Sequence, residues 1–271
     1  MSSSIADLLA ECGLPRAEAR LLLGAVASLG PTQMLGFPER LVEPAAAARF
    51  RELAARRLAG EPIAYLLGSR EFYSLEFNVS PAVLIPRPDT ELLVDLALER
   101  LPLDACRRVL DLGTGSGAIP VAIKKHRPDA QVSAVDLSPA ALEVARGNAA
   151  RHGVTIRFLQ SDWFAALGDE CFDLIVSNPP YIAAGDPHLE QGDLRFEPAG
   201  ALSDGGDGLE HLRSIIAKAP AHLEPGGWLL CEHGYDQAEA CRALLAAAGF
   251  GAVRSWCDLA GIERVSGGQR Q

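Results

Sequence analysis

The stretch VLDLGTGSGAIP, residues 109–120, decides the fold of this chain. Its apolar first half predicts a strand, and the glycines at 113, 115 and 117 permit the positive φ angles of a tight turn into a helix. The same glycines let the backbone come close to a ligand. Glycine turns between a strand and a helix are common, so this motif alone fits a plain βα connection as well as a binding loop.

Strands and helices alternate outward from this turn. The expected strands are Arg108–Leu112, Gln131–Asp136, Thr155–Gln160, Phe172–Ser177, Gly227–Glu232, Gly251–Trp256 and Glu263–Val265. The expected helices between them are Gly117–His126, Pro139–His152, Gly208–Lys218 and Gln237–Ala248. This order predicts an α/β fold with a mostly parallel, Rossmann-like sheet and helices on both faces. Residues 182–207 lack periodicity, and a loop of that length in a compact α/β domain is usually functional.

The first 70 residues have a different pattern. Ile5, Leu8, Leu9 and Cys12 follow the spacing of one buried helix face, and Ser4 can cap that helix. Residues 71–88 then alternate and are rich in aromatic and β-branched side chains, which favours a β-hairpin. We therefore expect a small all-α domain at 1–70, a hairpin linker at 71–88 and an α/β domain at 89–271.

Two further positions indicate a ligand that carries a nucleoside. Asp136 ends the strand after the glycine turn, where a carboxylate can accept both hydroxyls of a ribose. This pair of features fits NAD and S-adenosylmethionine equally. Asp162 and Trp163 end the third strand, where an indole face and a carboxylate acceptor suit an adenine, and they favour S-adenosylmethionine. Taken alone, Trp163 fits simple core packing as well.

The segment Asn178-Pro179-Pro180-Tyr181 follows the apolar strand FDLIVS, at the end where open α/β sheets bind ligands. Prolines have a fixed φ and no N–H donor, so their carbonyls point in set directions. Asn178 adds a side-chain acceptor and Tyr181 a flat aromatic surface. A proline-rich turn would account for the prolines but not for the flanking residues. The segment predicts a grip on a planar amino group.

Charge and cysteine content exclude several classes of protein. The 271 residues carry a net charge of −10, and no basic patch is visible that would displace counterions from a nucleic acid. The six cysteines form no CxxC pair and the six histidines no metal-binding spacing, so we expect neither disulfides nor a metal. The N-terminus lacks the basic region of a signal peptide and no apolar run is long enough for a bilayer. We expect a cytoplasmic protein without membrane contact.

The motifs together resemble the HemK/PrmC family, the S-adenosylmethionine-dependent glutamine methyltransferases that act on peptide chain release factors. The resemblance rests on DLGTGSG, VDLSP, NPPY and IPRPDTE, and on the segments RFEPAGALSDGGDGL (195–209) and LLCEHGYDQ (229–237). It implies methylation of the amide nitrogen N5 of the glutamine in a Gly-Gly-Gln motif, which modulates translation termination. It also implies that the helical domain docks the release factor.

The resemblance assigns site residues one by one. It places S-adenosylmethionine against Gly113, Thr114, Gly115, Ser116, Gly117, Asp136, Asp162, Trp163 and Asn178. It places the substrate amide against Asn178, Pro179, Pro180 and Tyr181, of which Asn178, Pro179 and Tyr181 carry the catalysis. No metal is implied.

Three other functions fit part of the pattern. A nucleic-acid amino-methyltransferase acting on adenine N6, cytosine N4 or guanine N2 would also use NPPY, although the net charge of −10 opposes it. An NAD-binding oxidoreductase would need an acid–base His or Lys near the cofactor, and none stands out. A non-catalytic binding module would not need the amide grip. The final SGGQRQ repeats the Gly-Gly-Gln tripeptide, and we expect it to form a disordered polar tail.

Overall fold

The computed structural model describes residues 3–103 and 106–271. The chain divides between Ser69 and Arg70 into two compact units, and each unit has a hydrophobic core of its own. We describe the two units separately.

The first unit is helical. Its elements are β1 (Ser3–Ser4), α1 (Ile5–Glu11), α2 (Arg16–Ala27), α3 (Pro31–Gly36), β2 (Leu41–Val42), α4 (Pro44–Leu58) and α5 (Ile63–Leu67). Ser4 caps α1 as predicted, because its hydroxyl accepts from the Asp7 N–H while Asp7 accepts from the Ser4 N–H. The core is built on Leu22 and Phe50, which are fully buried. The sequence did not predict α3 and α5, which are too short to show a helical period.

The second unit contains a mixed seven-stranded sheet in the order β10-β11-β9-β8-β5-β6-β7. The strands are β5 (Arg108–Leu112), β6 (Gln131–Asp136), β7 (Arg157–Gln160), β8 (Phe172–Ser177), β9 (Leu223–Glu232), β10 (Phe250–Cys257) and β11 (Glu263–Arg270). β5 to β9 pair in parallel, whereas β11 runs antiparallel to both β9 and β10. The expected α/β, Rossmann-like sheet is therefore present.

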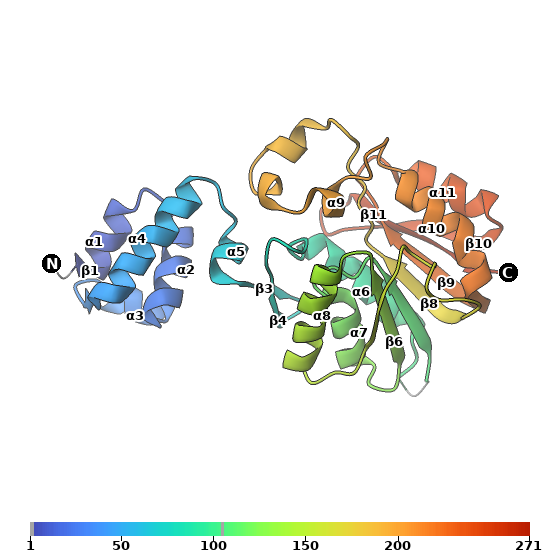
Figure 1. Ribbon diagram of the computed structural model, residues 1–271, viewed down its shortest axis with the longest axis horizontal. Helices are drawn as coiled ribbons and strands as arrows, with labels where there is room; N and C mark the ends of the chain where they lie inside the picture. Colours follow the sequence, from blue (N-terminus) through green and yellow to red (C-terminus); the bar gives the residue numbers. More distant parts are fainter. Residues whose placement is uncertain (1–2, 104–105) are drawn as a thin grey trace. The chain divides into compact units, whose positions relative to one another are not determined.

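Helices cover both faces of this sheet (Figure 1). α6 (Glu91–Arg100), α7 (Ala118–His126) and α8 (Pro139–Arg151) lie on one face, and α10 (Glu210–Lys218) and α11 (Ala238–Ala247) lie on the other. Alternate residues of a strand supply the two cores, as the period of two requires. Val109 and Val176 belong to the first core, while Leu110 and Ile175 belong to the second. This sandwiching fixes the ends of β5 and β8, from which the site is built.

A hairpin precedes the sheet. β3 (Ser69–Phe72) and β4 (Leu75–Asn78) are joined by Tyr73 and Ser74, which both have positive φ angles. Asn148 of α8 is fully buried and connects this hairpin to the glycine turn. Its side chain accepts from the Asn78 N–H and donates to the carbonyls of Asn78 and Ser116. The hairpin is thereby tied to the loop in which the cofactor residues are expected.

The C-terminal segment corrects one prediction. Instead of a disordered tail, Gly267, Gly268 and Gln269 form the middle of β11 and pair with Leu230, Leu229 and Trp228 of β9. A Cβ atom on Gly267 would lie 2.5 Å from the Leu229 carbonyl oxygen, so only glycine fits this interior strand. Self-methylation of the tripeptide has no support in a segment held this way.

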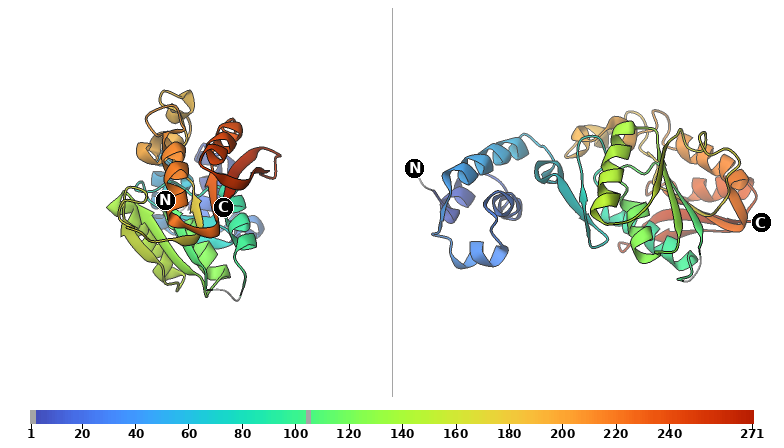
Figure 2. Two further views of the ribbon diagram at one scale, coloured as in Figure 1. Left: turned by 90° about the vertical axis from the view of Figure 1, so that its right-hand side faces the viewer. Right: turned by 60° about the horizontal axis from the view of Figure 1, so that its bottom comes forward.

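The long segment between β8 and α10 is only partly regular. It contains the 3₁₀ helices η2 (Pro187–Glu190) and η3 (Leu194–Phe196) and the short helix α9 (Ala199–Leu202). It projects beyond the end of the sheet, as both views of Figure 2 show. No described helix, within residues 3–103 and 106–271, is long and apolar enough to span a bilayer.

Candidate active site

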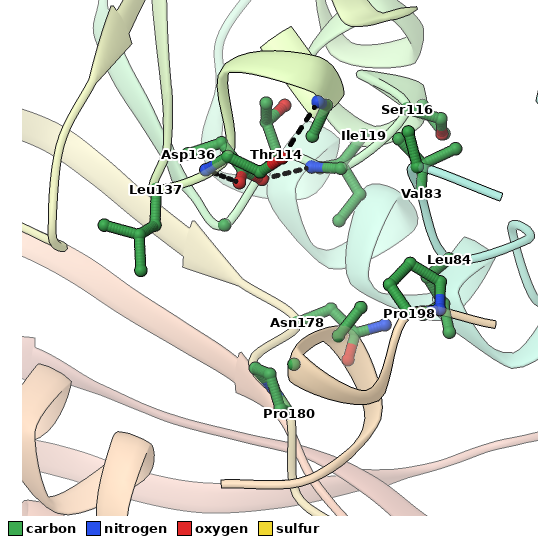
Figure 3. A pocket seen from close by; sticks show the side chains of 18 of the residues that line it. Val83, Leu84, Thr114, Ser116, Ile119, Asp136, Leu137, Asn178, Pro180 and Pro198 are labelled. Carbon is green, nitrogen blue, oxygen red and sulfur yellow. Dashed lines mark hydrogen bonds between the residues drawn. The ribbon is translucent and has the colours of Figure 1, made fainter. Parts of the chain in front are cut away.

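A cavity of about 350 Å³ opens at the carboxyl ends of β5, β6 and β8. The predicted residues that line it are Gly113, Thr114, Gly115, Ser116, Asp136, Asp162, Trp163, Asn178 and Pro180. Figure 3 shows Thr114 and Asp136 on one side of the cavity and Asn178 and Pro180 on the other. The remaining predicted residues, Gly117, Pro179 and Tyr181, lie outside the lining. The sequence thus located one cavity from four separate motifs.

The glycine turn has the backbone that its sequence requires. Gly113, Gly115 and Gly117 have φ angles of 73°, 52° and 78°. A Cβ atom on Gly117 would lie 3.0 Å from the Ala145 Cβ, so this glycine brings α7 close to α8. No neighbour limits Gly115, and its N–H donates to Asp136 Oδ2 at 2.8 Å. Gly117 therefore shapes the turn, whereas Gly113 and Gly115 face the cavity.

Asp136 is held rigidly at the end of β6. Its Oδ2 accepts from the Gly115 N–H and its Oδ1 from the Ser138 N–H, at 2.8 and 2.9 Å. Each carboxylate oxygen can accept a second hydrogen bond. Two fixed acceptors at the edge of the cavity match the two hydroxyls of a ribose.

Trp163 forms an apolar wall of the cavity. It has a φ of 50°, and its ring lies 5.2 Å from that of His211, measured between centroids. A Cβ atom on Gly113 would lie 3.3 Å from the indole, so the glycine allows the ring to lie across the turn. Asp162 beside it lines the same wall. The flat apolar surface with a neighbouring carboxylate fits an adenine.

Buried polar atoms near the turn support a bound cation. Asp111, on β5, is fully buried, and neither carboxyl oxygen has a hydrogen-bond partner among the described residues. Burial raises its pKa to about 7, and the nearby Thr114 hydroxyl partly opposes that shift. Thr114 Oγ1 likewise has no hydrogen-bond partner in the described part of the chain. Asp111 does not line the cavity, whereas Thr114, Asp136 and Asp162 do, and the oxygens of these three side chains suit the sulfonium and amino groups of S-adenosylmethionine.

The NPPY segment is fixed at its start. The Ser177 hydroxyl donates to the Leu112 carbonyl at 2.8 Å, which ties the end of β8 to β5. Asn178 Nδ2 donates to the Thr90 hydroxyl oxygen at 3.1 Å. Burial raises the pKa of the Tyr181 phenol, so this side chain stays neutral. The segment is therefore rigid and uncharged at the point where it borders the cavity.

Sequence reasoning placed Arg87 near the site but missed the apolar wall of the cavity that precedes it. Residues 82–87 precede α6 and line the cavity with Val83, Leu84 and Pro86, and Pro198 of the long segment appears next to Leu84 in Figure 3. Arg87 forms an ion pair with the buried Glu197, which also accepts from the Ile85 N–H at 2.9 Å. These contacts join two segments more than a hundred residues apart. The sequence signal for this wall was the apolar run AVLIP (82–86), which the sequence pattern assigned to the hairpin linker at 71–88.

Comparisons with known proteins identify the family of the chain. Residues 89–207 match the methyltransferase small domain family, and residues 3–68 match the PrmC N-terminal domain family. The release factor glutamine methyltransferase of Bordetella pertussis is 59% identical over 97% of each chain, and that of Burkholderia pseudomallei is 54% identical over 98% of this chain and 96% of its own. A methyltransferase structure from Pyrococcus furiosus has the same fold, with a TM-score of 0.56 and 19% identity, and covers 80% of this chain and 96% of its own. The chain therefore belongs to the release factor glutamine methyltransferase family.

Proposed function

We propose that this chain transfers a methyl group from S-adenosylmethionine to the side-chain amide nitrogen of the glutamine in the Gly-Gly-Gln motif of peptide chain release factors. The observation that carries the proposal is the Asn178-Pro179-Pro180-Tyr181 segment at the end of β8, beside a cavity suited to a nucleoside. Relatives that match this chain over almost their whole length are release factor glutamine methyltransferases. The chain is an S-adenosylmethionine-dependent methyltransferase. We further propose that it acts in the cytoplasm, where release factors are used.

S-adenosylmethionine, when bound, supplies an electrophilic methyl group on a sulfonium. Asp136 binds the ribose hydroxyls, and Trp163 with Asp162 holds the adenine. Gly113, Thr114 and Gly115 lie along the methionine portion. The cavity carries the acidic side chains Asp136 and Asp162, while its Arg87 is already paired with Glu197. An acidic lining favours a positively charged cofactor.

The NPPY segment activates the substrate amide by binding it. An amide nitrogen is a poor nucleophile because its lone pair is delocalised into the carbonyl. Asn178 Oδ1 and the Pro179 carbonyl accept the two amide hydrogens, and Tyr181 supports the amide plane. Both hydrogen bonds strengthen as positive charge develops on the nitrogen, so they stabilise the transition state more than the ground state. The methylated nitrogen then loses its proton to water.

The alternative substrate, a base amino group in a nucleic acid, would fit the same grip. The relatives do not favour it, since the curated ones are release factor enzymes. The net charge of −10 also opposes binding to phosphates. We therefore expect no direct contact with nucleic acid.

The decisive experiment is the variant Asn178→Ala, assayed with a full-length release factor at saturating cofactor. Losing one acceptor of the transition state is expected to slow turnover by on the order of 10²–10³-fold. Tyr181→Phe is the milder comparison, because it keeps the aromatic ring. Turnover of Asn178→Ala within a few fold of wild type would contradict the proposed grip, and methyl transfer to RNA instead of release factor would support the alternative.

A further inference from the structure

Asn178 shares its environment with a buried carboxyl group that the proposed reaction does not use. Glu232 is the last residue of β9 and is 1% exposed. β8 and β9 are parallel neighbours, and Ser177 pairs with Cys231. Asn178 and Glu232 are the next residue along each segment, so they lie at the same level at this edge of the sheet. Glu232 does not line the cavity. Its Oε2 has no hydrogen-bond partner among the described residues.

Thr90, at the start of α6, lies between the two strand ends and the cavity. It is 5% exposed and lines the cavity wall. Its hydroxyl accepts from Asn178 Nδ2 at 3.1 Å. Thr90 and Asn178 both lie near enough to Glu232 to lower the pKa of this carboxyl, against the increase that burial causes. The three groups form one network behind the amide grip.

A carboxamide needs such a neighbour to fix its direction. The oxygen and nitrogen ends of an asparagine side chain have nearly the same shape, and a hydroxyl such as that of Thr90 can donate or accept. Thr90 alone would therefore tolerate either orientation of Asn178. An ionised carboxylate only accepts, so it makes Thr90 donate toward it and leaves the Thr90 oxygen to accept from the Asn178 NH₂. This leaves Asn178 Oδ1 available, and the structure gives it no partner within the described residues.

We propose that Glu232 is a positioning residue that, in its ionised form, orients the Asn178 carboxamide so that its oxygen faces the substrate amide. The inference rests on the proposed role of Asn178. If the carboxamide turned over, its NH₂ would face the NH₂ of the substrate, and two donors cannot bind each other. Glu232 therefore acts through Thr90 and Asn178 without touching the substrate.

The charged groups around Glu232 set the pH at which this orientation is lost. Burial raises its pKa to about 7, with a further increase from Asp89, while Thr90, Arg264 and Asn178 lower it. Tyr181, on the same side, is neutral, because its own pKa is raised. Protonation turns one carboxyl oxygen into a donor and removes the constraint on Thr90. Methyl transfer should therefore increase as the pH rises through about 7.

The test compares wild type with Glu232→Gln, which keeps the shape but can donate. The pH profile of kcat/KM for a release factor reports the ionisation of the free enzyme. Wild type is expected to show an acidic limb near pH 7, and Glu232→Gln a 10–100-fold lower, flat profile, the size seen when a group that orients an active-site residue is removed. Glu232→Asp, which retains a carboxylate, should recover the limb. Glu224→Gln, an exposed position on the same strand, is the matched control.

The outcomes separate this inference from the proposed function. The thermal unfolding temperature of Glu232→Gln should equal or exceed that of wild type, since the variant removes a buried ionisable group. An acidic limb that survives in Glu232→Gln belongs to another group, such as Asp111, and overturns the inference. If Asn178→Ala slows the reaction and Glu232→Gln does not, only the role of Glu232 is wrong. If neither slows it, the proposed role of Asn178 has failed.

Discussion

Two carboxyl groups, Asp111 on β5 and Glu232 on β9, are buried near the carboxyl ends of parallel strands that flank β8. A buried carboxyl without a full set of hydrogen bonds opposes folding in its ionised form. Such residues are therefore candidates for function, because packing alone would favour an apolar side chain there. Asp111 lies behind the glycine turn and Glu232 behind the amide grip, so each borders one half of the proposed site.

The residue-scale prediction concerns Asp111→Asn. Burial raises the pKa of Asp111 from 3.8 to about 7, so the folded state binds this proton more tightly than the unfolded state. The contribution of Asp111 to the free energy of unfolding should therefore fall as the pH rises from about 4 to about 7. The loss from this group is at most about 4 kcal/mol, the equivalent of three pKa units.

Urea unfolding of both proteins without cofactor, from about pH 4.5 to pH 8, measures this effect. Asp111→Asn should show a smaller decline than wild type, because the buried Glu232 still has a raised pKa of about 7, and the variant should become the more stable protein at the alkaline end. Parallel pH profiles of the two proteins would show that Asp111 is not held with a raised pKa.

At the scale of elements, glycines and an amide hold the loops around the grip. Gln237, at the start of α11, donates from Nε2 to the carbonyls of Tyr181 and Gly208 at 3.0 and 3.1 Å. Its Oε1 accepts from the Gly234 N–H. The segments GGDGL and EHGYDQ, which supported the family resemblance but had no derived role, thus fix the position of Tyr181.

The prediction at this scale is that Gly208→Ala impairs methyl transfer. Gly208 has a φ of 85°, and an added Cβ would lie 2.5 Å from the Tyr181 carbonyl oxygen and 2.8 Å from Gln237 Nε2. Displacement of Tyr181 should lower turnover at least about tenfold, with little effect on cofactor affinity, because Gly208 does not line the cavity.

Gly205→Ala is the matched control for this variant. Gly205 lies in the same loop with a φ of 75°, but its added Cβ would meet nothing within 4 Å. Both variants carry the same backbone strain, of about 1 kcal/mol. Equal turnover in the two variants, measured with a release factor, would mean that strain and not contact with Tyr181 determines the effect.

The elements that the sequence predicted well are those with local signals. The apolar strands β5, β6 and β8 end at the predicted residues, because each is buried between two helix layers and bounded by turn residues. β11 was predicted too short, since Gly267 and Gly268 are poor strand formers and only their close approach to β9 and β10 explains them. Thr90 and Glu232 lie inside the segments IPRPDTE and LLCEHGYDQ, but only the tertiary fold brings them to Asn178, so no local pattern could assign their roles.

At the scale of the whole molecule, the two units differ in charge. Residues 1–69 hold seven acidic and seven basic side chains, so the net charge of −10 belongs to the second unit, which contains the cavity. The first unit contributes none of the lining residues. Cofactor binding is therefore a property of the second unit, and we assign the neutral helical unit the docking of the release factor.

The last prediction follows from this division and concerns a chain that begins at Arg70. The second unit retains both of its cores and all of the cavity lining, so the truncated chain should bind S-adenosylmethionine with an affinity close to that of the full chain. Its kcat/KM for a full-length release factor should fall at least about tenfold through KM, because the docking energy of the helical unit is lost. With a short Gly-Gly-Gln peptide, which lacks the rest of the release factor that the helical unit would dock, both chains should be equally active. Calorimetric titration with cofactor verifies that the truncated chain is folded. Equal kcat/KM of both chains on the whole release factor would refute a docking role, because the helical unit would then contribute nothing to substrate binding.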